Sequence, residues 1–268
     1  MTVLATPLRV TAPGGKTDLM FMNAADRVPL GLALRATTAR NKVIMRIGGG
    51  CANMQPYDKD LMIHYFVRAF EGFGGVLFTG ATRQFRGEGE DLTLDPMVTD
   101  LPGFIRDAYP NSGSVILGTV PRTGRPGLIG DSRFVLDKDG TGVNPSIELV
   151  VIVQPNPDTD ADWDGDLPLY FGLMEHLKDD AGFTAVGVCA WNGGGVTAKE
   201  ILASAKRGWP TFVVKGSGRK ADEFAQKLED RDPELLAQLP ANHKLIIVSK
   251  ERPEEFRVQL ATHGFLSL

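Results

Sequence analysis

The chain has 268 residues, of which 43% are hydrophobic and 23% charged, a composition typical of a folded globular protein. The formal net charge of -4 gives no electrostatic case for binding nucleic acid, and no apolar run approaches the roughly 20 residues that a membrane-spanning helix needs. Two cysteines are too few for a disulfide framework. We therefore expect a cytoplasmic protein with no nucleic-acid partner and no membrane insertion.

The first part of the chain, residues 1–41, carries no clear periodic pattern, and we expect an irregular lead-in that packs on the main domain. After it, short β-branched runs alternate with helical segments. Apolar residues recur every three or four positions over 58–73 and 219–229, which predicts amphipathic helices. The runs that we predict to be strands are 42–47, 75–80, 114–120, 147–153, 183–191, 210–215 and 244–249.

These runs are continuously apolar, as buried parallel strands are, and helices separate most of them. The pattern predicts an α/β fold: a Rossmann-like, doubly wound, mostly parallel sheet of about seven strands with helices on both faces. Because no linker or low-complexity tract divides residues 42–268, we expect them to form one ligand-binding domain.

Glycine-rich turns follow four of the predicted strands, at residues 48–50, 79–82, 193–195 and 216–218. The carboxyl ends of parallel strands meet at one edge of a sheet, where ligands bind. Glycine lets a ligand approach the backbone closely, and free N–H groups at a helix N-terminus favour an anion such as phosphate. A flexible turn without a ligand is the alternative for residues 48–50.

Arg219 and Lys220 fall in the first turn of a predicted helix, where the helix dipole disfavours cations by about 0.3–1 kcal/mol each. A bound anion would reverse that effect, and an arginine fork suits phosphate. The alternative is a solvent-facing pair of cations offset by Asp222. A long segment without periodicity, between the strands at 114–120 and 147–153, carries Arg122, which either closes over phosphate or is solvated.

Several other residues allow two interpretations. Thr197 and Glu200 form a capping box for a helix at 198–207, or else belong to a ligand loop. Cys51 lies beside a predicted helix N-terminus, a location that can lower the pKa of a thiol. His64 lies on an apolar helix, where we expect it to be packed. The start of a calcium loop is matched by Asp160, Asp162 and Asp164, but its twelfth position is Phe171, so a solvated acidic loop is favoured.

Taken in order, the loops resemble the TRPM-like (LSDAT) branch of the SLOG superfamily, in its prokaryotic type. Residues 47–53 resemble that family's T-G-G-A-x-N turn, and residues 192–197 its G-G-P-x-T loop. Residues 213–222 (VVKGSGRKAD) are close to its V-V-E-G-S-G-R-x-A-D segment, the most specific of the set. Residues 78–80, 117–122 and 134–141 resemble its other segments. Ile47 and Lys215 depart from the family's usual threonine and glutamate.

The resemblance implies a domain that senses a nucleotide-derived signal, with ADP-ribose and cyclic ADP-ribose as leading candidates, in an antiviral or stress system. We expect no required cofactor and no metal, and a separate effector protein is a candidate partner. We also expect a homo-oligomer. The residue patterns and the resemblance together give these candidate ligand-binding residues: Gly48, Gly49, Gly50, Asn53, Thr79, Gly80, Arg122, Asn192, Gly193, Gly194, Gly195, Thr197, Gly216, Ser217, Gly218 and Arg219.

Two alternatives remain open. Residues 192–200 are also similar to the P-G-G-x-G-T-x-x-E loop of the Lonely Guy phosphoribohydrolases, more distant members of the superfamily. This similarity places Glu200 on the catalytic carboxylate and would make the protein an N-glycoside hydrolase that acts on a nucleotide. The second alternative is a scaffold domain with a degenerate pocket.

Overall fold

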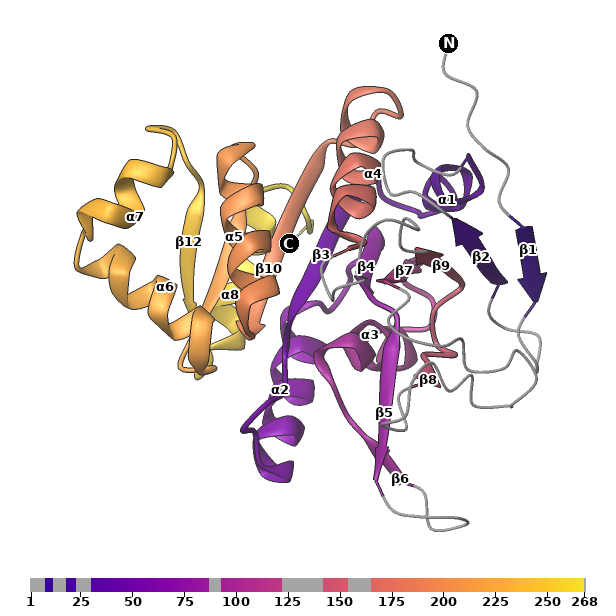
Figure 1. The fold of residues 1–268 in the computed structure, drawn as a ribbon, viewed down its shortest axis with the longest axis horizontal. Helices are drawn as coiled ribbons and strands as arrows, with labels where there is room; N and C mark the ends of the chain where they lie inside the picture. Colours follow the sequence, from indigo (N-terminus) through magenta and orange to yellow (C-terminus); the bar gives the residue numbers. More distant parts are fainter. Residues whose placement is uncertain are drawn as a thin grey trace, which may run out of the picture.

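The central sheet of the computed structural model has nine strands in the order β1-β2-β9-β7-β4-β3-β10-β11-β12 (Figure 1). The structure describes residues 8–11, 18–22, 30–86, 93–121, 142–153 and 165–267. The seven predicted strands are all present and parallel, so the predicted fold class is confirmed. They are β3 (Val43–Gly50), β4 (Val76–Gly80), β7 (Val115–Pro121), β9 (Leu149–Val153), β10 (Ala185–Asn192), β11 (Thr211–Lys215) and β12 (Leu245–Ser249).

The lead-in contributes two strands that show no periodic signal in the sequence. β2 (Asp18–Met22) pairs parallel with β9, and β1 (Leu8–Thr11) pairs antiparallel with β2. Neither strand is a continuous apolar, β-branched run like the predicted ones, since β1 reads LRVT and β2 reads DLMFM. These two strands therefore escape pattern analysis although they extend the sheet.

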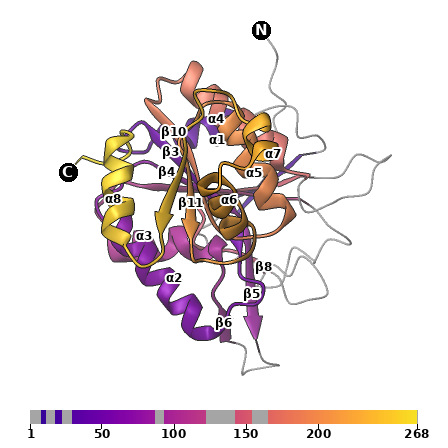
Figure 2. The same ribbon diagram turned by 90° about the vertical axis from the view of Figure 1, so that its left-hand side faces the viewer.

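Helices cover both faces of the sheet, which Figure 2 shows nearly edge-on. Alternate residues of β3 belong to opposite faces: Ile44 packs in one apolar cluster, Met45 in the other. The Ile44 side carries α1 (Leu30–Ala36) and α4 (Leu167–Asp179), and is continued by α5 (Gly195–Lys206), α6 (Arg219–Glu229) and α7 (Pro233–Gln238). The Met45 side carries α2 (Pro56–Ala69), α3 (Leu101–Ala108) and α8 (Pro253–Thr262). Within the described ranges, no helix has both the length and the apolarity to cross a membrane.

The strand order creates a switch point between β3 and β10. The chain runs from β3 outward through β4, β7 and β9, and then returns to β10 on the other side of β3. The first glycine triplet ends β3 and the second follows β10, whose last residue, Asn192, lies opposite Gly50 in the register. Ligands of open parallel sheets bind in such a crevice.

A small antiparallel sheet flanks this edge and was not predicted. It has the order β6-β5-β8 and comprises β5 (Thr82–Arg86), β6 (Thr93–Asp95) and β8 (Gly142–Val143). Buried Asp100, at the end of the 3-10 turn Val98–Asp100, accepts hydrogen bonds from Arg83 Nε at 2.8 Å and Asn144 Nδ2 at 2.9 Å. This buried network attaches the small sheet beside the carboxyl end of β4.

Candidate functional site

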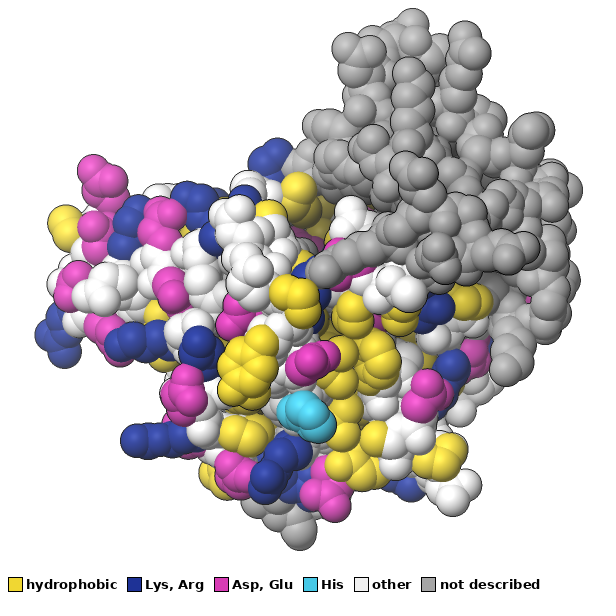
Figure 3. Space-filling view, turned by 90° about the horizontal axis from the view of Figure 1, so that it is seen from below, with side chains coloured by type: hydrophobic (Ala, Val, Ile, Leu, Met, Phe, Trp, Pro, Cys, Tyr) yellow, Lys and Arg dark blue, Asp and Glu magenta, His cyan; other side chains and the backbone are white. Residues whose placement is uncertain are grey.

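Two cavities lie at the carboxyl edge of the sheet, on either side of the contact between the β3–α2 and β10–α5 loops. Figure 3 views the molecule from this edge, where hydrophobic side chains gather near the middle of the described surface and charged side chains surround them. We call the larger, of about 440 Å³, the Arg219 cavity, and the smaller, of about 300 Å³, the Glu200 cavity. Both volumes fall in the range of small-molecule sites.

The predicted residues divide between these cavities. The Arg219 cavity is lined by Asn53, Asn192, Gly216, Ser217, Gly218 and Arg219. The Glu200 cavity is lined by Gly48, Gly49, Gly80, Thr197 and Glu200. Four predicted glycines line neither cavity: Gly50, Gly193, Gly194 and Gly195. The two triplets meet between the cavities, because a Cβ on Gly50 would lie 3.8 Å from Gly193 Cα. Buried Thr79 also lines neither, because its hydroxyl donates to Ile47 O at 3.3 Å. Arg122, Asp160, Asp162 and Asp164 lie outside the described residues.

The glycines at the switch point are required by close packing. A Cβ on Gly48 would lie 2.4 Å from Glu200 Oε2. Gly49 has a φ of +144°, and its Cβ would lie 2.1 Å from Trp191 O. A Cβ on Gly193 would lie 2.2 Å from Thr197 Oγ1. A side chain would therefore not fit at these three positions, and close packing gives a reason for glycine at each of them.

Arg219 begins α6 and points its guanidinium at the neighbouring helix α5. A Cβ on Gly194, the N-cap of α5, would lie 3.1 Å from Arg219 Nη2. Arg219 is exposed and has no hydrogen-bond or ion-pair partner among the described residues. Its neighbour Lys220 pairs with Glu223 at 2.5 Å, whereas Asp222 accepts from Gly216 N at 2.6 Å. Asp222 therefore accepts from the loop before its own helix, and Lys220 is the cation of the predicted pair that already has an acidic partner.

Backbone strain is concentrated at this cavity. Four non-glycine residues of the described chain have positive φ, and three of them line the Arg219 cavity: Asn53 at 69°, Asn192 at 53° and Arg219 at 44°. Asparagine tolerates this region, whereas for arginine it costs on the order of 1 kcal/mol or more. Asn192 is held by Nδ2 donating to Ala52 O at 3.2 Å and by its backbone N donating to Ser217 Oγ at 2.8 Å.

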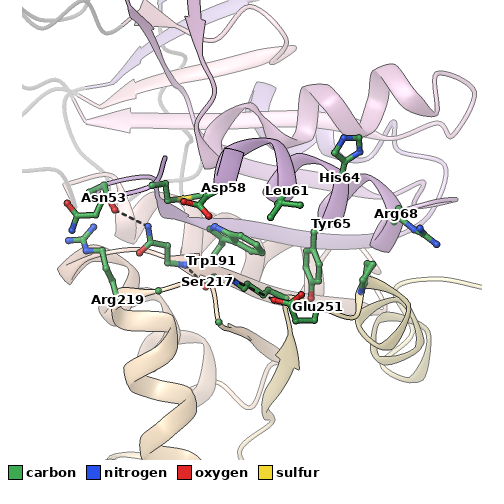
Figure 4. Close-up of a pocket in the computed structure, with 17 residues that line it drawn as sticks. Asn53, Asp58, Leu61, His64, Tyr65, Arg68, Trp191, Ser217, Arg219 and Glu251 are labelled. Carbon is green, nitrogen blue, oxygen red and sulfur yellow. Dashed lines mark hydrogen bonds and ion pairs between the residues drawn. The ribbon is translucent and has the colours of Figure 1, made fainter. Parts of the chain in front are cut away.

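The far end of the Arg219 cavity is aromatic (Figure 4). Trp191 and Tyr65 are buried, with ring centroids 5.4 Å apart. His64 is exposed at the cavity instead of packed as expected, because the buried stripe of α2 passes through Met62, Tyr65 and Phe66. Cys51 is partly buried, and this burial raises the pKa of its thiol to about 11, opposite to the shift that its position suggested.

The Glu200 cavity contains a buried ion pair. Arg46 Nη2 lies 2.7 Å from Glu200 Oε1, and the two side chains are 7% and 2% exposed. Arg46 Nε and the Tyr170 hydroxyl donate to the same oxygen, at 3.0 and 2.7 Å. The guanidinium also stacks on the Tyr170 ring, 4.3 Å from its centroid, while Nη1 is buried without a partner.

A second carboxyl group lines the same cavity. Asp166 Oδ2 accepts from Thr119 Oγ1 at 2.5 Å, and burial raises the pKa of Asp166 to about 6. Two carboxyl groups with different environments in one cavity are a recurring acid–base arrangement. In the described ranges no cluster of three or more histidine, cysteine or acidic side chains is placed to hold a metal.

The capping-box interpretation of residues 197–200 is wrong. Helix α5 begins at Gly195 with Gly194 as its N-cap, so Thr197 lies inside the first turn and Glu200 turns toward Arg46. Sequence reasoning also missed Arg46, Thr119, Asp166 and Tyr170. One signal was available: Arg46 interrupts an otherwise apolar run, and a buried charge needs a partner.

Part of the chain matches a known protein family. Residues 128–257 match the family described as SLOG in TRPM, prokaryote, in agreement with the resemblance of the loops at 192–197 and 213–222, which lie in that range. Similar solved structures include the molybdenum cofactor carrier protein from Chlamydomonas reinhardtii, with 13% identity, a TM-score of 0.42 and coverage of 83% of this chain and 99% of that chain. The X-ray structure of TM1055 has 17% identity and a TM-score of 0.45, with coverage of 83% and 98%. No curated protein matches the chain.

Proposed function

We propose that the protein binds a nucleotide-derived signalling molecule in the Arg219 cavity, with a ligand phosphate at Arg219. One observation carries the proposal: the Arg219 guanidinium, without a partner in the described chain, lies against the N-terminus of α5, which has no side-chain cap. The guanidinium and the positive end of the helix dipole repel each other when nothing lies between them. An anion between them is stabilised by the guanidinium N–H groups, by the helix dipole and by the free backbone N–H groups of α5.

The family match supports a nucleotide as the ligand, with ADP-ribose and cyclic ADP-ribose as leading candidates. Antiviral or stress signalling in the cytoplasm, assembly as a homo-oligomer and a separate effector protein are parts of the same proposal. No cofactor is needed for binding alone.

Isothermal titration calorimetry with ADP-ribose, cyclic ADP-ribose, AMP and inorganic phosphate tests this function. Arg219→Ala should weaken binding of the best ligand by about tenfold to a hundredfold, because a hydrogen bond to a charged group contributes about 1.5–3 kcal/mol. Lys220→Ala is the matched control, since this neighbouring cation already pairs with Glu223. Equal binding by wild type and Arg219→Ala would refute the assignment, and a protein that binds none of these compounds favours the scaffold alternative.

A second candidate function is N-glycoside hydrolysis in the Glu200 cavity. The specific observation in its favour is that Glu200 and Asp166 line one cavity with Arg46. Incubation with nucleoside monophosphates and with NAD, followed by chromatography, would detect a released base. We expect Glu200→Gln to abolish any release and Glu175→Gln, which alters an exposed ion pair with Arg207, to preserve it. Absence of released base from the wild-type protein contradicts this candidate.

A further inference from the structure

The Arg219 cavity has a cationic end and an aromatic end. In Figure 4, Arg219 and Asn53 lie together at one end, Trp191 follows, and Tyr65 lies farther along, toward Arg68. Asn192 lies near the cationic end, because a Cβ on Gly218, the N-cap before Arg219, would be 3.1 Å from Asn192 Oδ1. The cavity therefore presents a cation, then an amide oxygen, then two aromatic rings.

Three buried polar atoms along this path have no hydrogen-bond partner in the structure. They are Asn192 Oδ1, Trp191 Nε1 and the Tyr65 hydroxyl oxygen. The three residues are only 2%, 3% and 4% exposed. Among the described residues, one further buried side-chain atom lacks a partner, Arg46 Nη1, and it belongs to the Glu200 cavity. Native proteins rarely leave such atoms unpaired, so their concentration at the cavities points to a bound group that pairs them.

The three atoms differ in whether they can donate or accept a hydrogen bond. Asn192 Oδ1 can only accept, so it needs a donor such as a sugar hydroxyl. Trp191 Nε1 can only donate, and the Tyr65 hydroxyl can do both, so they suit the edge of a heteroaromatic ring. Leu61, Met54 and Pro253 add apolar surface to the cavity, as the faces of such a ring require.

Building on the proposed function, we infer that the Arg219 cavity binds a nucleoside monophosphate unit in one orientation and selects it by its base. The phosphate lies at Arg219, a sugar hydroxyl donates to Asn192 Oδ1, and the base edge pairs with Trp191 Nε1 and the Tyr65 hydroxyl. The three atoms are themselves buried, so the side chains of these cavity-lining residues must shift as the ligand binds to bring their polar atoms within hydrogen-bond distance of it. A sugar phosphate without a base leaves both aromatic polar atoms unpaired.

The test uses AMP and ribose 5-phosphate as probes for the wild-type protein, Tyr65→Phe and the control Tyr109→Phe. Tyr109 lies at the end of α3, outside the cavity, and loses the same hydroxyl. We expect AMP to bind at least about tenfold more tightly than ribose 5-phosphate. Tyr65→Phe should weaken AMP about threefold to tenfold, the effect of one hydrogen bond, and leave ribose 5-phosphate unchanged. Tyr109→Phe should change neither.

The unfolding midpoint of the free protein gives a second readout. Because the Tyr65 hydroxyl has no partner to lose, Tyr65→Phe should hold or raise this midpoint while it weakens AMP. Equal affinities for AMP and ribose 5-phosphate, unchanged AMP binding by Tyr65→Phe, or a lowered midpoint would each overturn the inference. In those cases the proposed function survives if Arg219→Ala still weakens both probes. If the wild-type protein binds no phosphate compound, both this inference and the proposed function are refuted.

Discussion

The buried Arg46–Glu200 pair gives the sharpest prediction about stability. Replacing Arg46 by methionine keeps a long unbranched side chain but leaves the Glu200 carboxylate buried with only the Tyr170 hydroxyl as a donor. Both partners are less than a tenth exposed, so solvent cannot compensate. Breaking such a pair from one side costs about 3–5 kcal/mol. For a domain of this size, that loss lowers Tm by on the order of 10 °C.

Urea denaturation of wild type, Arg46→Met, Glu200→Gln and the double variant measures the coupling between the two side chains. We expect the double variant to be about 2 kcal/mol more stable than Arg46→Met alone, because it has no unpaired carboxylate and the introduced glutamine can still accept from Tyr170. The reasoning is refuted if Arg46→Met costs less than about 1 kcal/mol, or if the two single effects simply add.

Two further predictions concern the same cavity. Gly48→Ala should lower the free energy of unfolding, measured in urea, by about 1–3 kcal/mol, because the added Cβ would lie 2.4 Å from an oxygen of Glu200, a side chain that Arg46 holds in place. Gly195→Ala is the control and should change this free energy little, because nothing lies within 4 Å of the added Cβ. For Asp166, the folded-state pKa of about 6 exceeds the ordinary 3.8, so the stability that its proton contributes is present below pH 4 and lost as pH rises through 6. Asp166→Asn should therefore gain up to about 3 kcal/mol relative to wild type between pH 4 and pH 7.5, measured by denaturation at both values, and a constant difference would contradict the raised pKa.

The sheet could be predicted because buried parallel strands are continuously apolar. Residues 149–153 (LVVIV) are buried at every position and stand out in the sequence without reference to neighbours. The small flanking sheet could not be found in this way: β5 reads TRQFR, and its pairing depends on partners near residues 94 and 143. Short, polar strands acquire their conformation from such long-range pairs, which no local pattern reports.

The edge that carries the site was also predictable, whereas its division into two cavities was not. Parallel strands bring their carboxyl ends together whatever their order, so the glycine turns had to gather. Where α5 begins is a different matter, because three consecutive glycines leave its first residue undefined by sequence. That choice decides whether Glu200 caps the helix or reaches Arg46, 154 residues away. Tyr170 and Asp166 join the cluster through α4, another long-range contact.

The charges of the two cavities suggest which glycine loop meets a phosphate. Gly48 faces Glu200 in a cavity where the Arg46 guanidinium is already paired with that carboxylate and Asp166 adds a second carboxyl group, so no unpaired side chain of opposite charge balances a phosphate there. On the other side of the glycine contact, Arg219 supplies a cation without a partner in the described chain, and α5 supplies free N–H groups. Close packing of β3 against β10 accounts for the first triplet, and the proposed function places the ligand phosphate at the turns that begin α5 and α6.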